Sequence, residues 1–328
     1  MGSKRKLLPH IAKVIQGRGY KTALDAFSGS GCVGYMFKEM GISTTTNDFL
    51  KFAYDMAHGA IENSHVRLTD SDLALLLSPN PARGTFIKDK FGDRYFSPED
   101  NDFLDNLISN IKLLPKSYSR SLALSAAHRS CLKRRARGIF TYTGIRYTDG
   151  RNDLKMSLQE HFVKAVSEWN KSIFDNGTVN QALNRDVFGL PTGYDLVYLD
   201  PPYLSPMSDN DYTRRYHFVE GLASYWQGLV IQEHTKTKKI VSKKTPFSSK
   251  STIHDAFDRL FEKFSASDIL LSYSSTGIPS KEELTAMLKN HKNRVDVIEI
   301  DHQYSFGTHS HMIGNVNNKI KEYLFLAS

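Results

Sequence analysis

One short segment near the N-terminus constrains the fold of this chain more than any other part of the sequence. Residues 22–27 (TALDAF) are apolar and predict a buried strand, and a small-residue loop follows at residues 28–31. Residues 32–40 predict a helix that ends at Gly41, and the β-branched residues 42–47 (ISTTTN) predict a second strand. The order strand, glycine loop, helix, strand is a βαβ unit, so the chain is expected to contain a parallel sheet.

Two kinds of periodicity divide the rest of the chain. Helical periodicity dominates residues 55–175. Strand character returns in four short apolar runs, at residues 194–199, 267–273, 295–300 and 322–326. We therefore predict an α/β protein whose sheet domain comprises residues 1–54 and 176–328, interrupted by a mostly helical insertion at residues 55–175.

The composition is that of an ordinary globular protein. Of the 328 residues, 40% are hydrophobic and 24% are charged, which excludes a disordered chain, a collagen-like chain and a coiled coil. No stretch approaches the roughly 18–20 apolar residues that span a bilayer, and the basic N-terminus lacks the apolar region of a secretory signal. The two cysteines, Cys32 and Cys131, are too few for a disulfide scaffold or a cysteine-rich zinc site. We expect a cytoplasmic protein that binds no membrane.

The glycine loop after the first strand matches a nucleotide-binding pattern. Residues 29–34 (GSGCVG) fit G-x-G-x-x-G, and Asp48 follows the second strand, where an acid suits ribose hydroxyls. A nicotinamide or flavin site and a purely structural glycine turn share this pattern. The alternative role of Asp48 is to cap the N-terminus of the helix after the strand. Asp25 precedes the glycines, however, and an acid there suits the sulfonium and ammonium groups of S-adenosylmethionine (AdoMet) better than a pyrophosphate.

The tetrapeptide Asp200-Pro201-Pro202-Tyr203 is the most informative motif of the sequence. It follows the strand predicted at residues 194–199 and so lies at the carboxyl edge of the sheet, where open α/β sheets bind ligands. Because the prolines fix φ near about −65° and donate no hydrogen bond, Asp200 and the Pro201 carbonyl are rigid acceptors. They can accept both hydrogens of an exocyclic amino group and direct its lone pair at an electrophilic methyl, while Tyr203 stacks on an extruded base. The alternative is a proline-rich turn that only closes the strand.

Together these motifs resemble the Dam-like family of site-specific adenine-N6 DNA methyltransferases, in the α-type motif order. The resemblance covers most of the chain outside residues 55–175. It implies a Rossmann-like AdoMet-dependent methyltransferase sheet, AdoMet as the methyl donor and a flipped-out adenine of duplex DNA as the acceptor. It implies catalytic roles for Asp200, Pro201, Pro202 and Tyr203, and cofactor binding by Lys4, Asp25, Phe27, Gly29, Gly31, Asp48, Phe49, Asp186 and Asp200.

Some of these positions carry more specific expectations from the resemblance. Lys4 falls in the family's N-terminal motif, and Asp48 and Phe49 match the ribose acid and the hydrophobic residue beside the adenine of the cofactor. Asp186, in the sequence NRDVF, resembles the acid that recognises this adenine. Residues 272–273, in LLSYSS, resemble the motif on the next strand, which carries no expected chemistry.

The same residues argue against related chemistries. Cytosine-N4 enzymes more often carry serine in place of Asp200, and cytosine-C5 enzymes need a cysteine after proline, which neither Cys32 nor Cys131 provides. No G-K-[ST] follows the glycines, which argues against phosphoryl transfer. Two alternatives stay open: an RNA or cytosine-N4 methyltransferase, whose amino-group chemistry is nearly identical, and a catalytically silent DNA-binding protein.

Basic charge gathers in two places outside these motifs, on a chain whose net charge is +8. Residues 129–151 carry seven cations and one acid, interleaved with aromatic residues, inside the insertion that this motif order uses for target recognition. Residues 236–250 carry six lysines and no acid. A solvated basic surface is the alternative in both places, but cations also bind phosphates and read guanine edges. We expect duplex DNA to contact Arg134, Arg135, Arg137, Arg146, Lys243 and Lys244.

The remaining expectations concern metals and partners. His302, His309 and His311 cluster near the C-terminus, but no cysteine or acid pattern completes a metal site, so no metal is expected. The resemblance implies the modification half of a restriction–modification system, with a cognate restriction endonuclease as partner, although an orphan methylase would have the same sequence features. We expect the chain to act as a monomer.

Overall fold

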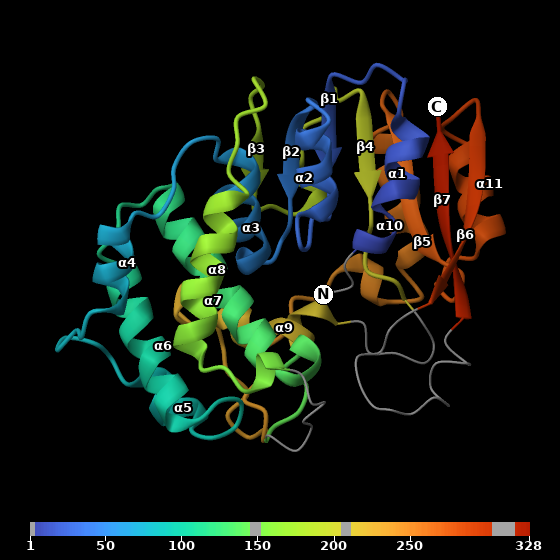
Figure 1. Ribbon diagram of the computed structural model, residues 1–328. Helices are drawn as coiled ribbons and strands as arrows, with labels where there is room; N and C mark the ends of the chain where they lie inside the picture. The colour runs from blue at the N-terminus through green and yellow to red at the C-terminus, as the bar shows by residue number, and fades with distance from the viewer. Residues whose placement is uncertain (1–3, 145–151, 205–210, 304–318) are drawn as a thin grey trace. The chain divides into compact units, whose positions relative to one another are not determined.

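The computed structural model describes residues 4–144, 152–204, 211–303 and 319–328 (Figure 1). These residues form two compact units, each described here by itself. The sheet unit comprises Met1–Phe49, Asn176–Asp211 and Lys243–Ser328. The helical unit comprises Leu50–Asp175 and Tyr212–Ser242.

Within the described residues, the sheet unit contains a seven-stranded sheet in the order β3-β2-β1-β4-β5-β7-β6. Its strands are β1 (Thr22–Asp25), β2 (Ser43–Asn47), β3 (Gln181–Leu183), β4 (Leu196–Leu199), β5 (Asp268–Ser274), β6 (Val295–Gln303) and β7 (Lys319–Ala327). Strands β1 to β5 are parallel, whereas β7 runs antiparallel to both β5 and β6. The strand order reverses between β1 and β4, which is the switch point where open α/β sheets bind ligands.

Helices cover both faces of this sheet (Figure 1). They are α1 (Leu8–Ile15), α2 (Cys32–Glu39), α10 (Ile253–Lys263) and α11 (Lys281–Lys289), with short 3-10 helices at Lys4–Lys6, Val187–Gly189 and Pro246–Ser248. Successive residues of β4 point to opposite faces: Leu196 and Tyr198 pack with α1 and α2, and Val197 and Leu199 pack with α10 and α11. All four side chains are buried, which explains why a parallel strand reads as a continuous apolar run.

The helical unit is built from helices in the described residues Leu50–Asp175 and from one further helix. They are α3 (Lys51–Ala57), α4 (Asp70–Leu77), α5 (Phe86–Phe91), α6 (Pro98–Ile111), α7 (Tyr118–Arg134), α8 (Leu158–Lys171) and α9 (Tyr212–Ser224), with a π-helical turn at His58–Glu62 and 3-10 helices at Ala136–Gly138 and Asn152–Leu154. The N-terminus of α8 is fixed by a capping box, in which Ser157 and Glu160 each accept a backbone N–H of the other residue.

The predicted fold class is confirmed, but the predicted domain bounds differ from the structure in two places. The four predicted apolar strands correspond to β4, β5, β6 and β7, and the βαβ segment to β1, α2 and β2. The prediction assigned residues 50–54 to the sheet domain, but the helical unit begins at Leu50. It also assigned residues 212–242 to the sheet domain, but they belong to the helical unit. The reason is aromatic packing: Phe218 stacks on Phe140 with ring centroids 5.1 Å apart, and Trp226 lies 4.9 Å from Phe91. These rings complete the core of the helical unit.

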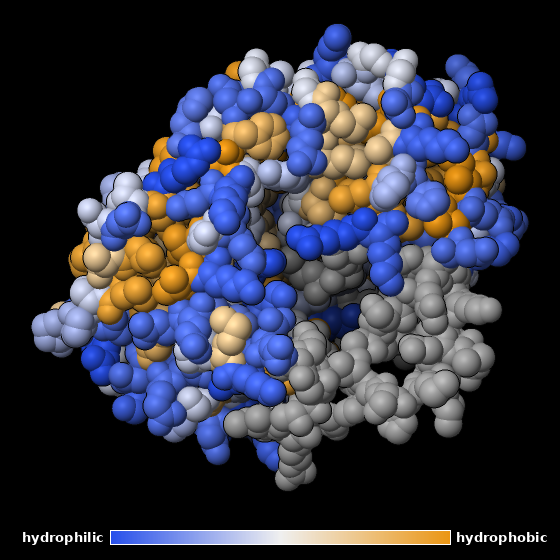
Figure 2. All heavy atoms as spheres, in the orientation of Figure 1, coloured by the Kyte–Doolittle hydropathy of each residue, from blue (hydrophilic) through white to orange (hydrophobic). Residues whose placement is uncertain are grey.

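Hydrophilic side chains cover most of the surface of each unit on the face shown in Figure 2, with hydrophobic residues in smaller patches. The most exposed large hydrophobic residues, Val179 and Val230, are 84% and 68% exposed and belong to different units. None of the described helices is long and apolar enough to cross a membrane.

Candidate active site

The Asp-Pro-Pro-Tyr turn leaves β4 at the carboxyl edge of the sheet, next to the end of β1. The Asp200 side chain is 19% exposed, and its Oδ1 lies 3.0 Å from Lys4 Nζ. The Tyr203 hydroxyl donates a hydrogen bond of 3.0 Å to the same oxygen. Burial raises the pKa of Asp200 above its ordinary range, and Lys4 opposes this rise without cancelling it. The structure therefore places the Asp200 carboxyl group, a hydrogen-bond acceptor, beside the Lys4 ammonium group at the switch point of the sheet.

A glutamate that sequence analysis did not single out completes this arrangement. Glu322, on β7, is fully buried and lies 2.5 Å from Lys4 Nζ. Its carboxylate also accepts hydrogen bonds from the Tyr203 hydroxyl and, at 3.0 Å, from Ser272 Oγ on β5. The only signal in the sequence was a charged residue at the start of the apolar run at residues 322–326.

The aromatic ring of Tyr203 is held as firmly as its hydroxyl. Its centroid lies 4.8 Å from that of Tyr273 in an edge-to-face arrangement, and Lys4 Nζ lies 4.7 Å from its centroid. Tyr273 is itself buried against Phe257 of α10. The pair Ser272-Tyr273, for which the sequence predicted no role, thus supports the turn through Glu322 and Tyr203.

The glycine loop connects β1 to α2 at the same edge of the sheet. Gly29 and Gly31 have φ angles of +50° and +74°, in the left-handed region that favours glycine. The Asp48 carboxylate accepts the backbone N–H of Gly29 at 2.8 Å, and Asp25 accepts that of Gly34 at 2.9 Å. The loop therefore brings both predicted acids against the backbone that would approach a nucleoside.

Asp25 is the strongest indication of a cationic ligand. Its side chain is buried, and its Oδ1 has no hydrogen-bond partner among the described residues. Burial, with smaller contributions from Asp200 and Asp48, raises the pKa of Asp25 to about 8, although the Gly34 N–H opposes the rise. An orphaned buried carboxylate is costly unless a ligand pairs with it. The sulfonium and ammonium groups of AdoMet fit this requirement.

The other predicted cofactor residues lie around this loop. Phe27 and Phe49 are half-buried next to the loop and next to Asp48, and Phe27 packs edge-to-face on Phe247 with centroids 5.5 Å apart. Asp186 is exposed and caps a 3-10 helix by accepting the Phe188 N–H at 2.9 Å. The structure thus gives Asp186 a local capping role, and its contact with a cofactor adenine stays a prediction.

Comparison with known proteins decides between the nucleotide sites that this geometry permits. A family model described as D12 class N6 adenine-specific DNA methyltransferase matches residues 1–287. The chain belongs to this family. Its methyl donor is therefore AdoMet, as predicted. The predicted resemblance to adenine-N6 DNA methyltransferases is confirmed.

Several type II methyltransferases are similar to the chain along most of its length. Type II methyltransferase M2.HphI of Haemophilus parahaemolyticus is 30% identical, over 93% of this chain and 90% of that protein. Type II methyltransferase M.CviAII of Paramecium bursaria Chlorella virus 1 is 24% identical over 99% of this chain and 96% of that protein. Type II methyltransferase M.FokI of Planomicrobium okeanokoites is 26% identical over 89% of this chain, which spans 46% of that longer protein.

The basic segment of this methyltransferase is arranged differently from the expectation. Arg135 was predicted to contact DNA, but it is only 3% exposed. Its guanidinium lies 4.4 Å from the Tyr142 ring centroid and 5.2 Å from that of Tyr95, and it donates to the carbonyls of Tyr142 and Gly144. Two tyrosine rings and four carbonyl groups surround Arg135, so its side chain is part of the interior of the helical unit.

The neighbouring cations also have partners within the unit. Arg134 pairs with Asp100 at 3.0 Å and donates to the Leu154 carbonyl. Lys133 pairs with Asp153 and Arg129 with Glu168. The remaining predicted residues of this segment, Arg146 and the side chain of Arg137, lie outside the described residues, as do His309, His311 and the side chain of His302.

Arg135→Ala is expected to destabilise the helical unit of the methyltransferase. The substitution removes hydrogen bonds to carbonyls of residues 139–144 together with a side chain that is only 3% exposed, which costs about 2–4 kcal/mol. The free energy of unfolding in urea measures this loss. Arg129→Ala serves as the control and should cost less, because the side chain of its partner Glu168 is 43% exposed. Equal unfolding midpoints for Arg135→Ala and the wild type would contradict the internal role.

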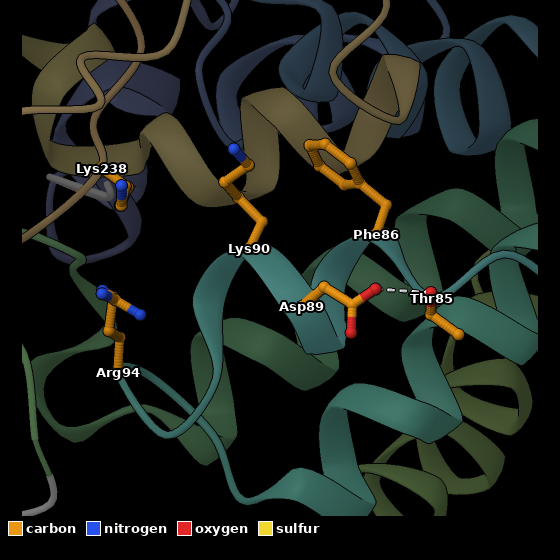
Figure 3. A pocket seen from close by; sticks show the side chains of 6 residues that line it. All are labelled: Thr85, Phe86, Asp89, Lys90, Arg94 and Lys238. Atoms are coloured by element: carbon orange, nitrogen blue, oxygen red, sulfur yellow. Dashed lines mark hydrogen bonds between the residues drawn. The ribbon is translucent and has the colours of Figure 1, made fainter.

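A surface cavity of about 520 Å³ in the helical unit of the methyltransferase contains several cations (Figure 3). Its lining residues are Thr85, Phe86, Asp89, Lys90, Arg94 and Lys238. Glu233 lies 2.7 Å from both Lys90 and Lys238, and Arg94 donates to the carbonyls of Phe91 and Lys236. These groups stabilise one another, so the cavity offers less positive charge than its lining residues suggest.

Proposed function

We propose that this methyltransferase transfers a methyl group from AdoMet to N6 of an adenine flipped out of duplex DNA at a specific sequence. The observation that carries the proposal is Asp200, held at the switch point of the sheet with Lys4 and Tyr203 on its Oδ1. Asp25, with its unpartnered oxygen, lies at the end of the adjacent strand. Family membership supports adenine N6 as the methylated atom.

The Asp-Pro-Pro-Tyr turn would act by positioning the base. Asp200 and the Pro201 carbonyl would each accept one hydrogen of the N6 amino group, so that its lone pair leaves the aromatic system and points at the methyl group. AdoMet supplies that methyl group, which its positive sulfur makes electrophilic. Pro201 is buried and Pro202 half-buried, which holds both acceptors still. Tyr203 would lie against the extruded base.

The residues of the glycine loop would bind the cofactor. The free oxygen of Asp25 would pair with its positive charge, and Asp48 would accept its ribose hydroxyls. Gly29 and Gly31 would admit it close to the backbone, because a side chain at a positive φ would be strained there. Lys4, Phe27, Phe49 and Asp186 would complete the site, as the family resemblance implies.

For DNA binding we propose the helical unit as the target-recognition part and the exposed Lys243 and Lys244 of the sheet unit as phosphate contacts. Replacing both lysines with alanine should weaken binding to all duplexes equally and reduce the salt slope of log affinity by about 1 for each lost contact. Fluorescence anisotropy at several salt concentrations measures both effects.

A matched control separates this effect from a general loss of charge. Lys21 and Lys289 are exposed lysines of the same unit, and their double alanine variant removes the same charge from other places. The proposal for Lys243 and Lys244 fails if both double variants have the same salt slope.

The type II relatives support a role as the modification half of a restriction–modification system. We further propose that the chain acts as a monomer beside a cognate restriction endonuclease. Expression in a host without other adenine methylases, followed by sequencing that detects N6-methyladenine, tests this role. The proposal predicts modification at every copy of one short sequence and protection from a nuclease that cuts there. Modification scattered without sequence preference would contradict site specificity.

A further inference from the structure

Glu322 is the most buried charge at the candidate active site, with a relative exposure of 0%. The antiparallel pairing of β7 with β5 places it opposite Ser274, at the carboxyl edge of the parallel strands. Its Oε1 accepts hydrogen bonds from Lys4 Nζ, Tyr203 and Ser272. Burying a carboxylate is costly, and the three donors on Oε1 offset part of this cost, whereas Oε2 has no hydrogen-bond partner among the described residues.

Two carboxylates therefore share one ammonium group. Lys4 Nζ lies 2.5 Å from Glu322 Oε1 but 3.0 Å from Asp200 Oδ1. The Tyr203 hydroxyl has one hydrogen to donate, and it lies within hydrogen-bond distance of both carboxylates. Glu322 thus competes with Asp200 for the same two donors, and Lys4 is closer to Glu322.

We infer that Glu322 is a positioning residue, which holds Lys4 and Tyr203 beside Asp200 while drawing their donated hydrogens toward itself. Because both donors are shared with Glu322, and a carboxylate has about four acceptor sites, the Asp200 carboxylate can still accept the amino group of the target adenine. Without the charge of Glu322, Lys4 would pair with Asp200 alone and would weaken the Asp200 carboxylate as an acceptor. The inference rests on the proposed function, because it assumes that Asp200 accepts hydrogens from the substrate.

The arrangement makes activity depend on pH in a defined direction. The groups that act electrostatically on Asp200 are Lys4, Tyr203, Glu322, Asp25 and Tyr198. After burial, the negative charge of Glu322 raises the pKa of Asp200, and Lys4 lowers it. An acceptor must be ionised, so turnover is lost as pH falls through this pKa. Removing the charge of Glu322 lowers the pKa and should move the acidic limb of the rate profile to lower pH.

Glu322→Gln tests the inference. Turnover at the optimum should fall about 10- to 100-fold, as expected when a reacting geometry is disturbed. The acidic limb of kcat against pH should move to lower pH. Carbon NMR of the protein without substrate provides a second measurement. The carboxyl signal of Asp200 is identified as the one missing in Asp200→Asn, and it should titrate at lower pH in Glu322→Gln than in the wild type. If turnover falls but neither the acidic limb nor the Asp200 titration moves, Glu322 has only a structural role and the inference is overturned. Unchanged turnover would overturn it as well.

Two further variants keep the test decisive. Ser272→Ala removes one donor to Glu322 but keeps both charges, so its acidic limb should stay in place. If Glu322→Gln does not fold, Glu322→Asp serves in its place. It keeps the charge but withdraws it from Lys4, so turnover should fall, and unchanged turnover would overturn the inference. Absence of N6-methyladenine with the wild-type protein would instead refute the proposed function, whereas the carboxyl titration would still report on Glu322.

Discussion

Asp200→Ala is expected to abolish methyl transfer while the chain still folds and binds duplex DNA. The substitution removes the acceptor on which Lys4 and Tyr203 converge, and with it one of the two groups that orient the amino group of the base. Losing a preorganised electrostatic group of this kind costs about 10²- to 10³-fold or more in turnover. Single-turnover transfer of labelled methyl groups measures the loss, and anisotropy with duplex DNA measures affinity.

A control variant makes this result specific. Asp255 is an exposed aspartate on α10 of the same unit, and Asp255→Ala should retain full turnover. Asp200→Asn keeps the size of the side chain and one carbonyl oxygen, and should retain slightly more activity than the alanine variant. A variant of Asp200 that loses DNA affinity as severely as turnover would undercut the catalytic assignment.

The affinity for AdoMet is expected to rise with pH because of Asp25. Its pKa is about 8 in the free protein, so the carboxyl group holds a proton at neutral pH. A cationic ligand pairs with the ionised form, so binding below this pKa must release the proton. The affinity should therefore increase by up to about tenfold per pH unit between about pH 6 and pH 8.

Calorimetry in two buffers with different ionisation enthalpies measures this proton release directly. Asp25→Asn cannot release a proton, and its affinity at about pH 8 should be lower by about 10- to 100-fold, the size of a lost hydrogen bond to a charged group. The amino group of AdoMet also titrates near pH 8, but this contribution is common to both proteins. Equal proton release by wild type and Asp25→Asn would contradict the proposed role of Asp25.

The parts of the site that the sequence predicted are local ones. The glycine loop and the Asp-Pro-Pro-Tyr turn are each continuous in the chain, and each directly follows an apolar strand of a parallel sheet. Strand ends of a parallel sheet meet at one edge, so two local patterns were enough to bring Asp25 and Asp200 to neighbouring strands. Strand β3 was not predicted, because its three residues (QAL) are too short to show a period.

Glu322 could not be predicted in the same way, because its role depends on contacts between distant parts of the chain. It lies 318 residues after Lys4, and only the antiparallel pairing of β7 brings the two together. From sequence alone, a glutamate beside an apolar run is as typical of an exposed strand end or an edge strand as of a buried carboxylate. The register of β7 decides between them.

Arg135 shows the opposite limitation. Counting cations in a segment predicts a basic surface, but it does not show which side chains point outward. The surroundings of Arg135 include Tyr95, which is 40 residues away in the chain, and those of Arg134 include Asp100. Similarly, residues 212–242 follow the Asp-Pro-Pro-Tyr turn in sequence but supply Phe218 and Trp226 to another core. Packing between distant segments decided each of these cases.

The most direct test of the central claim is to identify the methylated nucleoside. Purified protein would be incubated with methyl-labelled AdoMet and duplex DNA of mixed sequence, and the DNA digested to nucleosides and chromatographed. The arrangement around Asp200, together with the family, predicts label in N6-methyldeoxyadenosine, and none with Asp200→Ala. Label in N4-methyldeoxycytidine, or label in RNA but not in DNA under the same conditions, would contradict the account.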